Sequence, residues 1–181
     1  MKGKRIFSLI LTAAMALTMI PSTAFANEGI NTEEALTAAV SAAVDKQETI
    51  IKLDSNITLS NTLKIPSNKS IVLDLNGNKL GIKSSSEVID NSGTLTVKNG
   101  VMSTGNNGTS ANKAVITNAA EGVLTIEQDD SKETMLIGDR GIKNSGKAFI
   151  HGGIIKGHSV AYQGIKGSLA DIYGGELTSP G

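Results

Sequence analysis

The chain repeats one pattern along most of its length, and this repeat constrains the fold more than any other feature. The segment GIKNSGKAFIHGGIIKG (141–157) is followed by a near copy, GIKGSLADIYGG (164–175). The residues that close successive apolar alternations are Leu53, Leu75, Val97, Ile126, Ile150 and Ile172, in steps of 22, 22, 29, 24 and 22 residues. A period in the low twenties predicts a solenoid, in which each turn buries its apolar face against its neighbours.

Three further sets of residues recur at matching places in the repeat. They are the isoleucines Ile89, Ile116, Ile142 and Ile165; the asparagines Asn91, Asn118 and Asn144, continued by Gly167 and by Asn68 upstream; and the bend glycines Gly77, Gly100, Gly153 and Gly175. In a coil of parallel strands, equivalent residues stack about 4.8 Å apart. Inward aliphatic side chains then contribute roughly 1.5–3 kcal/mol each, and stacked asparagines hydrogen-bond to one another. An open β-sandwich, the alternative fold, does not require such columns.

One amphipathic helix precedes the repeats. Asn31 is followed three residues later by Glu34, the spacing of a capping box, which satisfies free amide donors at a helix start. Ala35, Leu36, Ala39, Val40, Ala43 and Val44 then form a narrow apolar stripe, and the pattern ends near Asp45. We expect residues 27–48 to form a short capping helix and residues 49–181 to form a β-helix of about six coils.

The first 26 residues have the three parts of a secretory signal peptide. Lys2, Lys4 and Arg5 give a positive start, an apolar run extends to Ile20, and Ala24-Phe25-Ala26 fits a cleavage site. The apolar run is too short for a bilayer, which needs about 20 residues, so we expect secretion or cell-surface location and no membrane insertion. Without this segment the chain has 14 basic and 17 acidic residues, a net charge of −3. An acidic chain does not suit nucleic acid, whose phosphates require a basic surface.

Composition narrows the chemistry further. The chain has no cysteine, which excludes disulfides, thiol catalysis and cysteine zinc sites. Aromatic residues make up 3% of the chain, while glycine is abundant at 20 residues. Many turns and an aliphatic, β-branched core are typical of short strands.

The stacked I-x-N-S-G columns, the Gly-Gly bends and the small opening helix resemble a right-handed parallel β-helix of the pectate-lyase-like superfamily. The segments LDLNGNKL and GTLTVKNG, followed by the Gly-Gly coils, are similar to β-helix regions of adhesin-like surface proteins from Gram-positive bacteria. The resemblance covers about residues 31–181. It implies the fold and a role as a surface scaffold, because the shared residues are packing residues.

The superfamily also contains lyases that cleave acidic polysaccharides with bound Ca²⁺ and a basic residue. The resemblance therefore implies an alternative, a polysaccharide-binding or lyase-like protein, in which Arg140 and Asp139 would be the catalytic residues and Asp129 and Asp130 the metal ligands. Adjacent strand residues point to opposite faces, and the aspartates of 129–130 belong to a polar insertion. We therefore expect no catalytic or metal site and no cofactor.

A column of varied residues should face outward beside the inward anchors. It contains Lys98, Glu127, His151 and Tyr173, and it is our candidate binding surface for a glycan or another surface protein. The chain ends at ELTSPG without an evident capping segment. An uncapped coil exposes strand edges. We therefore expect one of three arrangements: the sequence is truncated at its C-terminus, our preferred interpretation; Pro180 and its neighbours stop the coil; or the end associates with another chain, for instance end to end.

Overall fold

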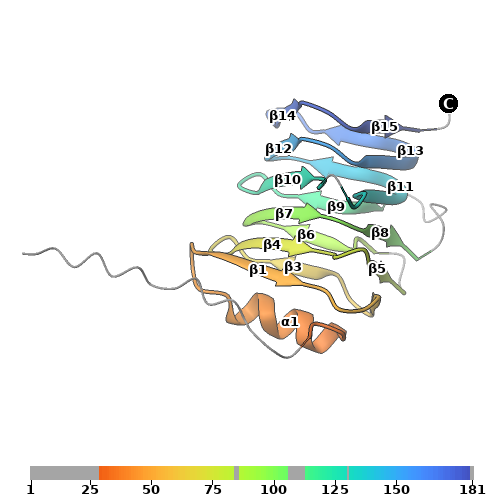
Figure 1. Cartoon of the computed structure of the whole chain (residues 1–181). Coiled ribbons are helices and arrows are strands. Elements are labelled where there is room, and N and C mark those ends of the chain that lie inside the picture. Colours follow the sequence, from red (N-terminus) through yellow and green to blue (C-terminus); the bar gives the residue numbers. More distant parts are fainter. Residues whose placement is uncertain (1–28, 84–85, 106–112, 130, 180–181) are drawn as a thin grey trace, which may run out of the picture.

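The computed structural model describes residues 29–83, 86–105, 113–129 and 131–179. The expected signal peptide and Asp130 lie outside these residues. The described chain confirms the predicted all-β, right-handed parallel β-helix with one short helix near its start (Figure 1). Helix α1 is Glu33–Ala42. The strands are β1 (Glu48–Lys52), β2 (Ile57–Leu59), β3 (Leu63–Ile65), β4 (Ser70–Asp74), β5 (Lys79–Ile82), β6 (Ile89–Asn91), β7 (Thr94–Lys98), β8 (Val101–Thr104), β9 (Ala114–Asn118), β10 (Val123–Glu127), β11 (Met135–Asn144), β12 (Lys147–Ile150), β13 (Ile154–Gly164), β14 (Leu169–Ile172) and β15 (Glu176–Thr178).

The strands stack into three faces around one core. The first sheet is β1-β4-β7-β10-β12-β14, and its six parallel strands mark five complete turns. The second face contains β2, β5, β8 and the first half of β11, and the third contains β3, β6, β9 and the second half of β11. Strands β11 and β13 are long because each continues around the corner between these two faces. At the bend of β13, a Cβ on Gly157 would overlap the backbone of Val160, so only glycine fits there.

The inward stack of the first sheet differs slightly from the predicted one. Its members are Ile51, Leu73, Val97, Ile126, Ile150 and Ile172. The predicted anchors Leu53 and Leu75 lie two residues beyond their place in this stack, just past the ends of β1 and β4. Both are fully buried. Since a shift by two residues preserves the inward face, the alternation alone could not distinguish the two registers.

Three predicted columns end differently from expectation. Tyr162, rather than Ile165, pairs with Ile142, and Gly164 rather than Gly167 pairs with Asn144. Ile65, rather than Asn68, pairs with Asn91. The predicted bend column also misplaces Gly77, because Asn78 hydrogen-bonds to Val101, the residue after Gly100. In the last turn, the register follows the pairing of β13 with β11, and the repeated Gly-Ile-Lys segment begins at Gly164, the last residue of that pairing.

The asparagine column forms a buried ladder of side-chain amides. Asn91 Nδ2 donates to Asn118 Oδ1 and Asn118 Nδ2 donates to Asn144 Oδ1, each at 2.7 Å. Each amide also donates to backbone carbonyls of its own and the next turn. Asn144 Nδ2 finally donates to the Tyr162 hydroxyl at 2.8 Å. Burial raises the pKa of that phenol, and the bond from Asn144 partly offsets the rise.

Helix α1 closes the first turn of the coil (Figure 1). Leu36, Ala39, Val40 and Ala43 pack into the core, and Leu36 is fully buried. The N-cap is Thr32, whose hydroxyl accepts a hydrogen bond from the Ala35 amide at 3.1 Å, so the predicted cap at Asn31 is one residue early. The helix ends at Ala42, before the predicted end near Asp45, because Ala43 is already extended with ψ of 139°.

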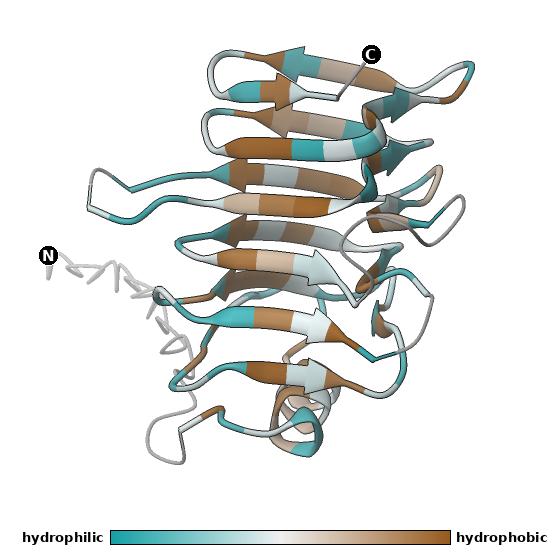
Figure 2. Ribbon diagram, turned by 90° about the vertical axis from the view of Figure 1, so that its right-hand side faces the viewer, coloured by the Kyte–Doolittle hydropathy of each residue, from teal (hydrophilic) through white to brown (hydrophobic). Residues whose placement is uncertain are grey.

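The opposite end of the described coil is open. Ile172 occupies the inward stack of the first sheet, yet it is 51% exposed because no described strand lies beyond β14. Figure 2 shows apolar segments repeated at similar positions in successive turns, up to this last one. The core is therefore covered by a helix at one end and accessible at the other.

We predict that Asn118→Ala lowers the free energy of unfolding by about 3 kcal/mol, because it leaves buried amide and carbonyl groups without partners at about 1–3 kcal/mol each. Urea unfolding followed by circular dichroism measures the change. The matched control is Asn68→Ala, an exposed asparagine that should change stability by less than about 0.5 kcal/mol. Equal stability of the two variants would contradict a structural role for the ladder.

Candidate functional site

Asp129, a predicted metal ligand, lies at the corner that follows β10 and stabilises the fold there. Its carboxylate accepts a hydrogen bond from Asn99 Nδ2 at 2.6 Å and lies 3.7 Å from Lys98 Nζ. Asn99 adopts a left-handed backbone with φ of 63°, a conformation that asparagine adopts more readily than most residues with a side chain. Asp129 therefore helps to hold this tight turn.

Asp139 and Arg140, the predicted catalytic pair, lie at a different corner, where β11 bends between the second and third faces. The pairing of β11 with β13 shifts register between Gly138 and Arg140. Asp139 is only 4% exposed, and its carboxylate accepts a hydrogen bond from the Ser159 hydroxyl at 2.6 Å. Arg140 Nη1 donates to Gln163 Oε1 at 2.7 Å. Strand β11 separates this corner from Asp129, and both side chains bond to neighbouring turns.

Within the described part of the chain, no group of three or more histidine, cysteine, aspartate or glutamate side chains is arranged to hold a metal ion. Asp139 and Arg140, the pair suggested for acid–base chemistry, share one corner, whereas Asp129, a suggested metal ligand, lies at another. Asp130 falls outside the described residues.

The predicted outward column is a regular stack on the first sheet. Lys52, Asp74, Lys98 and Glu127 pair in register, and the His151 and Tyr173 amides bond to the carbonyls of Ile126 and Ile150. We call these six residues the outer column. Its first four members alternate in charge from turn to turn. Opposite charges on neighbouring strands attract one another modestly, at roughly 0.2–1 kcal/mol per pair.

A second outward-facing stack, which sequence reasoning missed, runs beside the outer column, with its two end members exposed and the four between them half-buried. This central column contains Ile50, Val72, Thr96, Thr125, Phe149 and Asp171. Ile50 is 58% exposed. The signal was present in the alternation, because a residue that lies two positions before an outward residue on a strand also faces outward. The first sheet therefore presents a flat face of mostly β-branched side chains beside a row of alternating charges.

The last two turns concentrate aromatic rings on this face. The rings of His151 and Tyr173 are 5.1 Å apart and meet edge to face at 68°. Tyr173 is 72% exposed, and Phe149 lies two residues before His151 on the same face. Each exposed ring is followed by two glycines, 152–153 and 174–175, so no side chains cover it from the adjoining corner. The first-sheet face thus has an accessible aromatic end.

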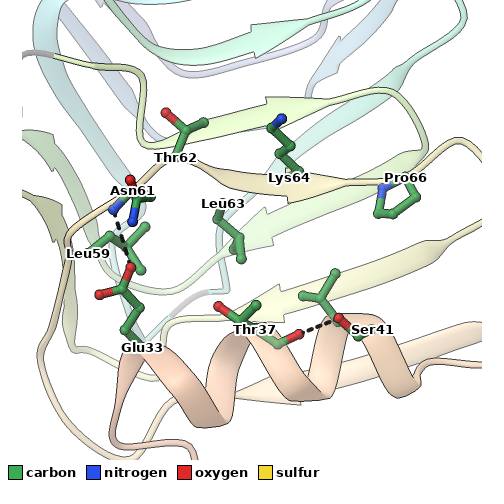
Figure 3. Close-up of a pocket in the computed structure, with 10 residues that line it drawn as sticks. Glu33, Thr37, Ser41, Leu59, Asn61, Thr62, Leu63, Lys64 and Pro66 are labelled. Atoms are coloured by element: carbon green, nitrogen blue, oxygen red, sulfur yellow. Dashed lines mark hydrogen bonds between the residues drawn. The ribbon is translucent and has the colours of Figure 1, made fainter.

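A separate groove of about 420 Å³ lies between α1 and the second and third faces (Figure 3). Leu59, Leu63 and Val40 line it with apolar groups, and Glu33, Asn61 and Lys64 contribute polar ones. The Glu33 carboxylate accepts hydrogen bonds from the Ser60 and Asn61 amides at 2.9 and 3.2 Å. The Ser41 hydroxyl donates to the Thr37 carbonyl. The two bonds to Glu33 join the helix to the β2–β3 corner, whereas the Ser41 bond is internal to the helix. The groove therefore has a structural role that the sequence did not indicate.

The hydrogen bonds at this corner change the pKa of Glu33. The amide of Ser60 is the main cause that holds the pKa of Glu33 below its ordinary value. Burial opposes it, and the Asn61 amide adds a further lowering effect. Similarly, Lys69 lowers the pKa of Asp45 just beyond the helix. Both carboxylates are therefore more stable in their charged form in the folded chain than in the unfolded one.

We predict that acid loosens the helix cap through Glu33. Because its folded pKa is lowered, its contribution is present above the ordinary carboxyl pKa near 4.5 and is lost as pH falls through the lower folded value. The fall in melting temperature between pH 6 and pH 3 should be smaller in Glu33→Gln than in the wild type. Glu34→Gln, at the neighbouring exposed position, serves as control and should keep the wild-type pH dependence. An unchanged dependence in Glu33→Gln would contradict the role of these amides.

Across the described residues, none of the helices has the length and apolar character needed to cross a membrane. Comparison with protein-family models found no match, and searches of curated proteins and of solved structures found none either. The fold assignment therefore rests on the strand pairing itself.

Proposed function

We propose that the protein is an exported, non-catalytic β-helix scaffold that presents the outer face of its first sheet to a partner at the cell surface. One observation carries the proposal. The first-sheet face is regular and open to solvent, with in-register outer and central columns, whereas Asp129 lies at one corner, Asp139 and Arg140 lie at another, and all three bond to neighbouring turns. A regular ordered face suits binding, and an acid–base pair that lies away from the suggested metal ligand does not suit metal-dependent catalysis.

The proposal includes membership of the pectate-lyase-like superfamily and likeness to β-helix regions of Gram-positive adhesin-like proteins. The stacked asparagines and the capping helix support it. The partner is a surface glycan or a surface protein. End-to-end association is also part of the proposal, because Ile172 and the unpaired edge of β14 in the described structure could accept another strand.

The second candidate function is a lyase-like or glycan-binding protein for acidic polysaccharides, with Ca²⁺ as cofactor. The observation in its favour is that Arg140 is partly accessible on the outside of the coil, next to the buried carboxylate of Asp139.

We predict that the purified protein releases no unsaturated product from polygalacturonate with Ca²⁺, measured as ultraviolet absorbance over time. Wild type and Arg140→Ala should give the same flat trace as a blank, because no metal ligand set is assembled beside Arg140 among the described residues. An authentic pectate lyase provides the positive control. A Ca²⁺-dependent rise in the wild type that Arg140→Ala abolishes would establish the second candidate function instead.

We also predict that an antibody to residues 27–48 detects the native product outside the cytoplasm, in medium or cell-wall fractions. The reason is the positive, apolar and small-residue order of residues 1–26. A cytoplasmic protein serves as the marker for leakage. A product retained with that marker would contradict export.

A further inference from the structure

We infer that the aromatic end of the first-sheet face binds a neutral polysaccharide chain that runs along the coil axis. This inference rests on the proposed non-catalytic binding function and names its ligand class. The site is formed by Phe149 and Asp171 of the central column and His151 and Tyr173 of the outer column.

The rings supply the apolar half of such a site. Sugar rings offer flat faces of C–H groups, which pack against exposed aromatic rings and bury area on both sides. Tyr173 is 72% exposed, and its ring centroid lies 5.1 Å from that of His151 in an edge-to-face contact. Such a contact favours one relative orientation of the two rings, which reduces the conformational freedom lost on binding.

Polar groups beside the rings supply the specificity. Asp171 follows Phe149 in the central column, and Glu127 precedes His151 in the outer column. Their carboxylates can accept hydrogen bonds from sugar hydroxyls, and bonds to charged acceptors are stronger than neutral ones. Aromatic stacking with carboxylate acceptors is suited to a polyhydroxylated ligand.

The charge on this face selects against acidic polymers. Three lysines on the outward positions of the first sheet, Lys52, Lys98 and Lys147, stand against four carboxylates, Glu48, Asp74, Glu127 and Asp171. Lys98 is also paired with Asp129. A polyanion would meet net repulsion near the rings, so a neutral chain is favoured.

The spacing of the columns selects a sugar chain over an extended peptide. Equivalent side chains recur every 4.7–4.9 Å or so along the axis, whereas an extended peptide repeats at about 3.3 Å per residue. A pyranose ring in an extended chain spans about one strand step. A neutral polysaccharide can therefore present one ring per turn along the two columns, with the aromatic end as its anchor.

The test is native affinity electrophoresis of the chain without its expected signal peptide, residues 27–181, in gels that contain a neutral β-glucan, a galactomannan or polygalacturonate. We expect at least one neutral polymer to retard the wild type and polygalacturonate to leave it unretarded. Tyr173→Ala and His151→Ala should each weaken retardation at least about tenfold, since single aromatic anchors dominate such sites. Tyr173→Phe keeps the ring and should retain most of the binding.

The matched control is His158→Ala, which removes the other histidine of the chain from an exposed position on β13 and should bind like the wild type. Retardation by polygalacturonate alone, by none of the neutral polymers, or equally in Tyr173→Ala and wild type would overturn the inference. Sedimentation velocity tests a different partner for the rings. If Tyr173→Ala changes the oligomeric state without changing retardation, the rings contact a second copy of the chain instead. Each of these results is compatible with the proposed non-catalytic scaffold function, whereas cleavage of the polymer would contradict it.

Discussion

Backbone hydrogen bonding between parallel strands in constant register is the interaction on which the rest of this structure depends. It places each residue directly above its equivalent one turn earlier, so that equivalent side chains of successive turns are neighbours. Aliphatic stacks, the amide ladder and the alternating charges are three results of the same register. Extra residues can enter only at corners, as between β8 and β9 and between β10 and β11, where they do not shift the strands.

The sequence was sufficient to predict the fold because stacking requires similar residues at equivalent positions of each turn. This requirement appears in the sequence as a regular repeat. It could not predict every register. Leu53 and Ile51 both face inward, so their hydrophobicity cannot distinguish them, and only the backbone pairing shows that Ile51 pairs with Leu73. Likewise, Ile165 resembles Ile142 in its local sequence, while the continuous strand β13 brings Tyr162 to that position. Local likeness identifies the repeat, and long-range pairing decides the alignment.

The candidate site was partly predictable for the same reason. The outer column follows from counting one residue past each inward anchor, because successive residues of a strand point to opposite faces. Phe149 follows from the same argument, because it lies two residues before His151 and faces the same side of the sheet. The groove beside α1 was not predictable, since the bonds of Glu33 to Ser60 and Asn61 join parts of the chain that share no pattern. The separation of Asp129 from Arg140 likewise depends on which corner each residue occupies.

The closed first turn has a consequence for how the chain is made. Helix α1 and β1 are synthesised before any other described element, and each later turn docks on one that already exists, a few tens of residues upstream. No strand of the first sheet needs to wait for a distant partner. The coil can thus grow turn by turn in the order in which the chain emerges from the ribosome. Its assembly has a direction, and the finished turns serve as the template for those still arriving.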